Sequence, residues 1–467
     1  MLRFGTDGVR GDADNDLPSW FVDALARAVA RVLQPERVFV GRDTRASGPR
    51  IEAELAVGLR AEGVDPVLLG VLPTPAIAFV AAAERVPAAI VSASHNPWSD
   101  NGVKVIGADG RKLPDEAEAA IEAELEASSS FVAFATRRDT RLADAQDSGE
   151  LAALTAIDTG TASFAADGAS ADAYMAHLLS TLGGRRLDGV EVVLDCANGA
   201  GFDIGPRVLR AAGAQVRVLH AAPDGRNIND GCGSTHPERL RRTVVEQGAA
   251  LGLALDGDGD RVIAVDEHGE LVDGDQLMTM TAIDMHARGT LRNGAIAVTV
   301  MSNLGLRRAM RAGGIRVVET PVGDRNVVAA MQTNDLVLGG EQSGHIVYSE
   351  YATTGDGLLT GLFVCDLMQR TNRPLSALAA QMTRVPQVLV NVRVARRVDL
   401  ATSAALAEAV RSVEQELGQT GRVLVRASGT EPLVRVMIEA DAQSVADTAA
   451  ERLRSLVTSE FGSAEAP

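Results

Sequence analysis

The stretch AAIVSASHNPWSDNGVKV, residues 88–105, joins a short apolar run to a small polar loop. The run AAIV has no polar face and ends in β-branched residues, which is typical of a buried strand. The loop after it contains Ser94, His95 and Asn96 and ends at a proline, which cannot continue a central strand. We therefore predict a buried strand whose carboxyl end presents a serine, with Lys104 further along the same stretch.

The same pattern, an apolar run that stops at a loop of Gly, Asp, Ser or Asn, recurs along the chain. Ala-rich segments of helical period, such as residues 51–61 and 401–417, lie between the repeats. This alternation predicts an α/β fold with buried, mostly parallel strands, whose ligands bind beyond the carboxyl ends of the strands. The other loops of this kind are in RVFVGRDTRASG (37–48), VEVVLDCANGAG (190–201), LGLALDGDGDR (251–261), LVLGGEQSGH (336–345) and RVLVRASGTEP (422–432).

Length and composition indicate a soluble protein of several domains. The chain has 467 residues, of which 46% are hydrophobic and 3% aromatic, and this length suggests roughly three or four domains. Residues 127–168 are rich in small and polar residues and have no clear period, so we predict a long connection after the first domain. The composition changes again near residues 383–387, before a smaller C-terminal domain.

Charge and cysteine content exclude several classes of protein. The net charge is −17, the opposite of the usual balance in a nucleic-acid-binding protein. No run of about 18 apolar residues predicts a membrane span, and the start MLRFGTDGVRG does not resemble a secretory signal. The three cysteines are widely spaced, so we expect reduced thiols, neither a disulfide framework nor a zinc site, and a cytoplasmic location.

The sequence LDGDGDR places Asp256, Asp258 and Asp260 at alternate positions with glycines between them. Carboxylates this close repel one another unless a cation lies among them, and oxygen ligands favour Mg²⁺ or Ca²⁺. An EF-hand is excluded because Arg261 occupies the position where that loop requires glycine. A solvated acidic turn stays open as the alternative to a metal site.

Three further loops could carry a phosphate or bind a phosphate or a sugar. Ser94 is either an ordinary turn residue or, if phosphorylated, an anion that suits the predicted cation; no G-x-S-x-G motif supports acyl transfer. The loop RASGTEPLVR combines hydroxyl, N–H and guanidinium donors, as a phosphate clamp does, although a plain hairpin turn is the alternative. The residues concerned are Arg426, Ser428, Gly429, Thr430 and Arg435 for the clamp, and Glu341, Ser343 and His345 for sugar hydroxyls.

Taken in order, FGTDGVRG, SASHNP, DGDGDR, GGEQSGH and RASGTEP resemble the motifs of the α-D-phosphohexomutase family. LDCANGAG, TVMSNLGL and TPVGDRNV are similar to the branch that acts on glucosamine phosphates. The resemblance implies three related α/β domains with mixed sheets and a smaller C-terminal α+β domain, similar to the TATA-binding protein, around a central cleft. The implied domains are residues 1–170, with the phosphoserine loop and linker, 171–265, with the metal loop, 266–384, with the sugar loop, and 385–467, with the clamp.

The resemblance also implies roles for individual residues. Ser94 is the expected phosphoserine, and with Asp256, Asp258 and Asp260 it is expected to hold one Mg²⁺ per chain. Lys104 and Arg10 are expected to handle protons and to stabilise the phosphate. His95, Asp100 and Asn101 are expected to support the loop. The residues expected to bind substrate are Thr320, Gly323, Glu341, Ser343, His345, Arg261, Arg426, Ser428, Gly429, Thr430 and Arg435.

The implied reaction converts glucosamine 6-phosphate into glucosamine 1-phosphate, with glucosamine 1,6-bisphosphate as intermediate or activator, and feeds UDP-N-acetylglucosamine synthesis. Gln342 favours the amino sugar, because relatives that act on mannose and glucose phosphates often have methionine there. The linker is longer than is usual in the family, and Asn326 stands where an aromatic residue is more common. An activating kinase is a candidate partner, and both a monomer and a homodimer fit the resemblance.

Three alternatives stay open from the sequence. A phosphomannomutase/phosphoglucomutase would use the same residues on other sugars. A sugar-phosphate sensor would keep the fold without catalysis, and a metal-dependent phosphatase would use the same loops to release inorganic phosphate.

Overall fold

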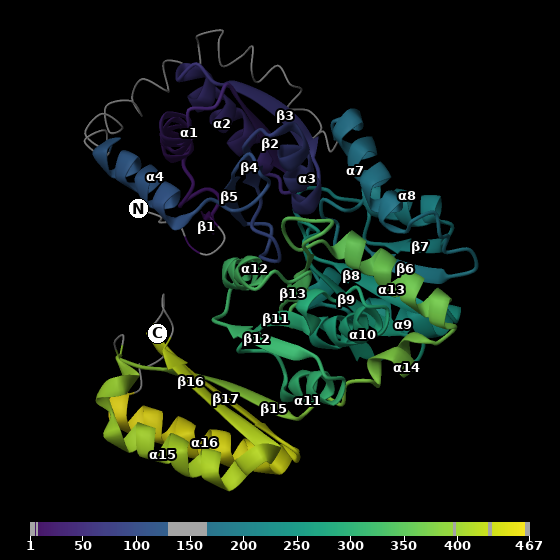
Figure 1. The fold of residues 1–467 in the computed structure, drawn as a ribbon. Helices are drawn as coiled ribbons and strands as arrows, with labels where there is room; N and C mark the ends of the chain where they lie inside the picture. Colours follow the sequence, from purple (N-terminus) through teal and green to yellow (C-terminus); the bar gives the residue numbers. More distant parts are fainter. Residues whose placement is uncertain (1–4, 6–7, 129–165, 396–397, 428–431, 463–467) are drawn as a thin grey trace. The chain divides into compact units, whose positions relative to one another are not determined.

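The computed structural model describes residues 5, 8–128, 166–395, 398–427 and 432–462. They form two compact units, Met1–Val300 with Ile315–Ala379 and Met301–Gly314 with Ala380–Pro467. The first unit contains three sheets with helices, and the second contains one antiparallel sheet (Figure 1). Of the predicted linker over 127–168, residues 129–165 lie outside the described residues.

The first sheet has the order β1-β5-β4-β2-β3. β2 is parallel to β3 and β4, whereas β5 is antiparallel to β4 and β1, so the sheet is mixed, as expected. All four residues of β4 are buried, which confirms the strand predicted from AAIV. The elements are β1 (Val9–Asp12), α1 (Ser19–Leu33), β2 (Arg37–Arg42), α2 (Gly48–Ala61), β3 (Asp65–Val71), α3 (Thr74–Glu84), β4 (Ala88–Val91), β5 (Asp100–Ile106) and α4 (Asp115–Ala127).

The second and third sheets repeat this plan. The second sheet has the order β10-β9-β8-β6-β7, in which β6 and β8 are parallel and β9 is antiparallel to β8. The third has the order β12-β11-β13-β14, in which β11 and β13 are parallel and β14 is antiparallel to β13. The strands are β6 (Glu191–Asp195), β7 (Gln215–Leu219), β8 (Leu251–Leu255), β9 (Val262–Asp266), β10 (Leu271–Val272), β11 (Ala295–Thr299), β12 (Arg316–Thr320), β13 (Leu338–Gly340) and β14 (Ile346–Tyr348). The helices are α7 (Gly168–Thr181), α8 (Ile204–Ala212), α9 (Glu238–Gln247), α10 (Gly274–Ala287), α12 (Asp324–Thr333), α13 (Gly357–Thr371) and α14 (Leu375–Ala379).

The second unit is an α+β domain. Its antiparallel sheet has the order β15-β17-β16, and two helices cover one face of it (Figure 1). Helix α11 (Leu304–Ala312) lies between β11 and β12 in the sequence but belongs to this unit, where Arg308 pairs with Asp441 at 2.7 Å. The other elements are β15 (Gln387–Arg393), α15 (Ala404–Leu417), β16 (Gly421–Ala427), β17 (Leu433–Ala440) and α16 (Gln443–Phe461).

None of the helices in the described part of the chain combines the length and hydropathy that crossing a membrane requires. The domain boundaries at residues 170, 265 and 384 stay predictions.

A buried carboxyl group starts α13. Asp356 accepts a hydrogen bond from the Leu359 N–H at 2.9 Å and another from the Tyr174 hydroxyl at 2.8 Å. Burial raises the pKa of Asp356 from 3.8 to about 6. Because the folded chain holds this proton more tightly than the unfolded chain, stability is lost as the pH rises through this range.

Asp356→Asn is therefore expected to stabilise the protein more at about pH 8 than at about pH 5. An asparagine can still cap α13 and bond to Tyr174, but it does not ionise. Thermal melts of both proteins at the two pH values test this. A Tm difference that is constant, or that falls with rising pH, would contradict the account.

Candidate active site

The serine of the first sheet and the aspartates of the second meet in the first unit. The Ser94 hydroxyl donates a hydrogen bond to Asp256 Oδ2 at 2.7 Å, although the two residues are 162 positions apart. Ser94 follows β4, and Asp256 follows β8, so both lie beyond the carboxyl ends of strands. Both are buried, with 1% and 0% of their surface exposed. The structure thus brings together the serine and the acidic loop that the sequence predicted to act as one site.

The three aspartates form a compact cluster. One carboxylate oxygen from each of Asp256, Asp258 and Asp260 lies within 4.8 Å of the others, and all three residues are buried. A Cβ atom on Gly257 would lie 2.6 Å from the Ser94 carbonyl oxygen, so glycine is needed where the two loops touch. The spacing DGDGD is therefore required for both the convergence of the carboxylates and their approach to Ser94.

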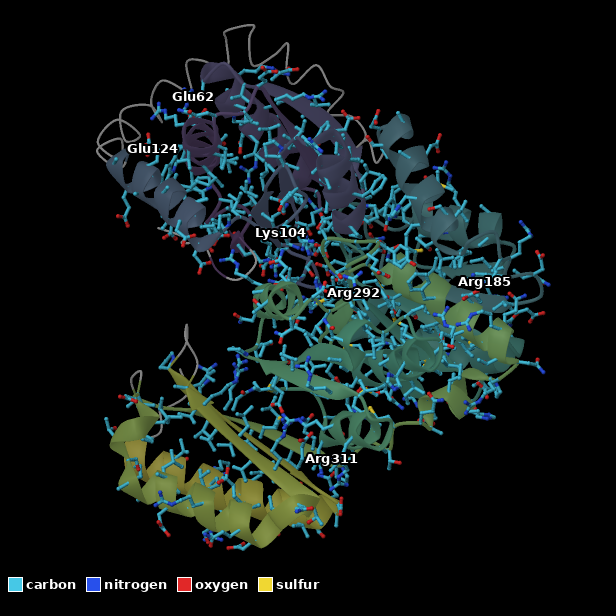
Figure 2. All side chains as sticks on the ribbon, in the orientation of Figure 1. Glu62, Lys104, Glu124, Arg185, Arg292 and Arg311 are labelled. Carbon is cyan, nitrogen blue, oxygen red and sulfur yellow. The ribbon has the colours of Figure 1, made fainter. Side chains whose placement is uncertain are left out.

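Lys104 lies beside this cluster, where the first domain meets the loops of the other two (Figure 2). Its ammonium nitrogen is 2.7 Å from Asp258 Oδ2 and 3.6 Å from Asp260 Oδ2. Burial and the negative charge of Asp260 both oppose the ionisation of Asp258. The positive charges of Lys104 and Arg10 outweigh them, so the pKa of Asp258 is lowered. Arg10 lies on β1, next to the strand that carries Lys104, so both predicted cations face the acidic cluster.

Asp256 has the opposite shift. Burial raises its pKa well above the ordinary value, and the charges of Asp260 and Asp258 add to the effect. A divalent cation among the three aspartates would offset the repulsion between their carboxylates at short range.

The donor atoms fit a hard cation. Asp258 Oδ1 and Asp260 Oδ1 are buried and accept no hydrogen bond from any described residue. The ligand atoms that the three aspartates and Ser94 offer are carboxylate and hydroxyl oxygens, which suit Mg²⁺ better than a soft metal. The predicted metal ligands therefore lie together and have free acceptor capacity.

The residues around Ser94 hold its loop. His95 Nδ1 lies 3.5 Å from the Ser94 hydroxyl oxygen, and burial, followed by Arg261 and Arg10, lowers the pKa of His95 to about 4. Asp100 accepts a hydrogen bond from Asn96 at 2.9 Å. The Asn101 side chain donates to the Ser47 hydroxyl at 2.8 Å. The roles expected for His95, Asp100 and Asn101 stay predictions.

The residues predicted to bind the sugar, Glu341, Ser343 and Thr320, lie around the ends of β13 and β12. Glu341 accepts a hydrogen bond from the Gly323 N–H at 3.1 Å, and Ser343 is exposed. Thr320 is buried and donates to the Pro321 carbonyl oxygen at 2.9 Å.

His345 and Arg261 contact the aspartates directly. His345 is 3% exposed, and its Nδ1 lies 3.6 Å from Asp260 Oδ2. The Arg261 N–H donates to Asp256 Oδ1 at 3.1 Å. His345 therefore lies beside a predicted metal ligand, and its contact with substrate stays a prediction.

The predicted phosphate clamp belongs to the second unit. Arg426 on β16 and Arg435 on β17 are directly paired across the sheet. Like charges in this arrangement repel each other, and burial, followed by Arg435, lowers the pKa of Arg426. An anion between the two guanidinium groups would remove this repulsion. Ser428, Gly429 and Thr430 lie outside the described residues.

Thr74, Arg45 and Asn229 are among the described residues that contact the site without having been predicted from the sequence. Thr74 donates from its hydroxyl to Asp258 Oδ2 at 2.8 Å. Arg45 and Asn229 both donate to the Ser94 carbonyl oxygen, at 2.8 and 2.9 Å. Arg45 lies in one of the recurring strand-end loops, which is the one signal that could have singled it out.

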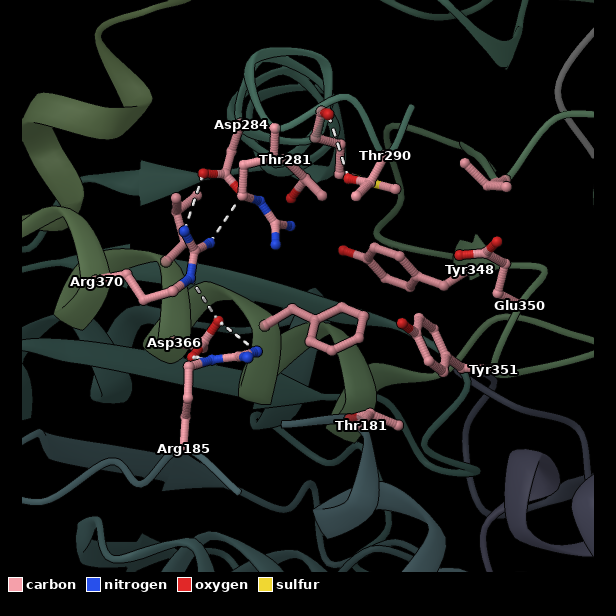
Figure 3. A pocket seen from close by; sticks show the side chains of 15 residues that line it. Thr181, Arg185, Thr281, Asp284, Thr290, Tyr348, Glu350, Tyr351, Asp366 and Arg370 are labelled. Carbon is pink, nitrogen blue, oxygen red and sulfur yellow. Dashed lines mark hydrogen bonds and ion pairs between the residues drawn. The ribbon is translucent and has the colours of Figure 1, made fainter. Parts of the chain in front are cut away.

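A cavity of about 120 Å³ lies elsewhere in the first unit, and the residues of α10 and α13 line much of it (Figure 3). Arg370 bridges Asp284 and Asp366 there, both at 2.8 Å, and Arg185 contacts Asp366 at 2.7 Å. None of the predicted site residues lines this cavity. Its charged groups neutralise one another, so we interpret it as structural.

The chain matches the family models of four phosphoglucomutase/phosphomannomutase domains. They are alpha/beta/alpha domain I over residues 1–131, domain II over 172–269, domain III over 273–385, and the C-terminal domain over 389–456. The phosphoglucosamine mutase of Salinispora tropica is 49% identical over 457 residues, which cover 96% of this chain and 97% of that protein. The phosphoglucosamine mutase of Rhodococcus opacus is 47% identical over 463 residues, which cover 98% and 99%.

Solved structures share the fold at lower identity. A phosphoglucomutase/phosphomannomutase family protein from Burkholderia thailandensis has a TM-score of 0.75 at 24% identity, over 97% of both chains. The N-acetylphosphoglucosamine mutase of Aspergillus fumigatus, in complex with GlcNAc-6P and magnesium, has a TM-score of 0.69 at 20% identity, over 98% of this chain and 95% of that one. A complex of the Aspergillus enzyme with glucose 1,6-bisphosphate has a TM-score of 0.65 at 20% identity, over 99% and 96%.

Proposed function

The chain belongs to the phosphoglucomutase/phosphomannomutase family, and we propose that it interconverts glucosamine 6-phosphate and glucosamine 1-phosphate. The observation that carries this proposal is the 2.7 Å hydrogen bond from the Ser94 hydroxyl to Asp256, within the buried cluster of three aspartates. A hydroxyl in this position can carry a phosphoryl group beside a cation. The choice of the amino sugar is supported by relatives named phosphoglucosamine mutase at 47–49% identity.

The oxygens of Asp256, Asp258, Asp260 and Ser94 are the proposed ligands of one Mg²⁺. When bound, this ion draws charge off the phosphoryl oxygens and so makes the phosphorus easier to attack. The magnesium in the Aspergillus N-acetylphosphoglucosamine mutase complex supports the same choice of ion.

In the proposed reaction, phospho-Ser94 gives its phosphoryl group to the 1-hydroxyl of glucosamine 6-phosphate. The bond from phosphorus to Ser94 Oγ breaks as the bond to the sugar oxygen forms, and the proton of the sugar hydroxyl passes to Ser94 Oγ, which becomes a free hydroxyl again. Lys104 and Arg10 stabilise the negative charge of the group in transfer, because both are cations close to Asp258.

The resulting glucosamine 1,6-bisphosphate turns round and returns its 6-phosphoryl group to Ser94, which leaves glucosamine 1-phosphate. Glu341 and Ser343 are the proposed contacts for the sugar hydroxyls. Arg426 and Arg435 are the proposed contacts for whichever phosphate is not reacting, since two guanidinium groups can hold it in either orientation. The bisphosphate in the Aspergillus structure supports an intermediate of this kind.

A side-by-side assay of glucosamine 6-phosphate, glucose 1-phosphate and mannose 1-phosphate tests the choice of substrate. We expect the glucosamine phosphate to have a kcat/KM larger by about tenfold or more. Equal or greater turnover of mannose 1-phosphate would favour a phosphomannomutase/phosphoglucomutase. Release of inorganic phosphate without the isomer would indicate a phosphatase, and no turnover of any sugar phosphate would indicate a sensor.

A further inference from the structure

Ser94 has an unusual backbone conformation. Its φ is +52°, in the left-handed region that residues with a side chain rarely adopt. Such a conformation persists only where the surrounding structure holds it from several directions. The groups that hold it here also decide where the Ser94 hydroxyl points.

Arg45 provides the largest share of these contacts. Its side chain is completely buried, and each of its five N–H donors has an acceptor. Nε donates to the Asp43 carboxylate at 2.9 Å. The four Nη hydrogens go to main-chain carbonyl oxygens of one loop, those of Ser94, Asn96, Pro97 and Asp100.

Both main-chain groups of Ser94 are held by side chains. Its N–H donates to the Ser92 hydroxyl oxygen at 2.9 Å, and that hydroxyl donates to Asp43 at 2.7 Å. Its carbonyl oxygen accepts from Arg45 at 2.8 Å and from Asn229 at 2.9 Å. Asp43 therefore supports both main-chain groups of Ser94, the N–H through Ser92 and the carbonyl oxygen through Arg45, because it also accepts a hydrogen bond from Arg45.

We propose that Arg45 is a positioning residue for phosphoryl transfer, which fixes Ser94 in its left-handed conformation and so aims the hydroxyl at Asp256. Arg45 lies in the loop after β2, is buried, and donates all its side-chain hydrogen bonds to protein acceptors, so it acts through the loop. A lysine keeps the charge but has three donors around one nitrogen, and it cannot reach four carbonyl oxygens and a carboxylate together. The kinetic part of this inference rests on the proposed function.

Arg45→Lys tests the proposal. We expect kcat for glucosamine 6-phosphate to fall about 10- to 100-fold, because a misplaced nucleophile lowers the rate of transfer. KM is expected to stay within about twofold, since the proposed sugar and phosphate contacts are not altered. Amide hydrogen exchange in the peptide that contains Ser94 is expected to be at least about tenfold faster.

Arg50→Lys is the matched control. Arg50 also donates to two main-chain carbonyl oxygens, those of Ala13 and Leu17, and pairs with Glu54, but it makes no contact with the loop of Ser94. This variant is expected to keep the kcat of the unchanged protein. A folded Arg45→Lys protein whose kcat stays within about threefold of the unchanged protein would overturn the proposal.

Arg45→Gln serves if Arg45→Lys does not fold. It removes the guanidinium group without burying a new charge, and Asp43 keeps its hydrogen bonds from the Ser92 hydroxyl and from the main-chain N–H at position 45, so faster exchange at Ser94 and a lower kcat are expected. Unchanged exchange and kcat in this variant would also overturn the proposal. Hydrogen exchange does not depend on the reaction, so it tests the role of Arg45 even if the unchanged protein does not turn over glucosamine 6-phosphate.

Discussion

Replacing Ser94 by alanine is expected to lower kcat for the mutase reaction by roughly four orders of magnitude or more. The change removes the oxygen that carries the phosphoryl group, and no other residue in the described part of the site offers a hydroxyl to the same cluster of carboxylates except Thr74, whose hydroxyl already donates to Asp258. Conversion of glucosamine 6-phosphate, measured in the presence of glucosamine 1,6-bisphosphate and Mg²⁺, tests this.

Ser99→Ala is the matched control, because Ser99 lies in the same loop and donates only a long hydrogen bond of 3.5 Å to Asp100. It is expected to retain most of the activity. If Ser94→Ala kept more than about a tenth of the activity, Ser94 would not be the phosphoryl carrier.

Asp258→Asn is expected to weaken Mg²⁺ binding by at least about tenfold and to lower kcat by roughly 100-fold or more. It removes one of the three proposed anionic ligands and also a close partner of Lys104, whose nitrogen lies 2.7 Å from the carboxylate. Calorimetric titration with Mg²⁺ and steady-state kinetics at saturating Mg²⁺ measure the two effects separately.

Asp266→Asn is a suitable control for this prediction. Asp266 is also a buried aspartate and ends β9 of the second sheet, but its carboxylate accepts main-chain hydrogen bonds from His268 and Glu270 and lies outside the acidic cluster. It is expected to leave Mg²⁺ affinity unchanged. Equal Mg²⁺ affinity in Asp258→Asn and the unchanged protein would exclude this carboxylate from the metal site.

Much of the fold and the centre of the site could be predicted because each depends on a local pattern. The run AAIV is apolar on both faces, and a strand buried on both faces needs that pattern. Asp256 and Ser94 follow such strands, so their convergence is expected from the way α/β sheets present strand ends. The need for the glycine between Asp256 and Asp258 could also be predicted, since only glycine allows this loop to touch the loop of Ser94.

The contacts of Arg45, Thr74 and Asn229 could not be predicted in this way. Arg45 and Asn229 bind main-chain carbonyl oxygens, which every residue has, so the identity of the partner leaves no mark on the sequence. Thr74 reaches Asp258 across 184 positions, and nothing in its own segment indicates that partner. Helix α11 is a similar case, because its unit is decided by tertiary contacts such as that of Arg308 with Asp441.

Mass spectrometry of the purified protein, before and after incubation with glucosamine 1,6-bisphosphate and Mg²⁺, tests the central claim most directly. The account predicts one phosphoryl group per chain, on the peptide that contains Ser94 and at that residue, which is lost when glucosamine 6-phosphate is supplied in excess. The account would be contradicted if the protein interconverts the two glucosamine phosphates while Ser94 never carries phosphate, or if the phosphate is found on another residue.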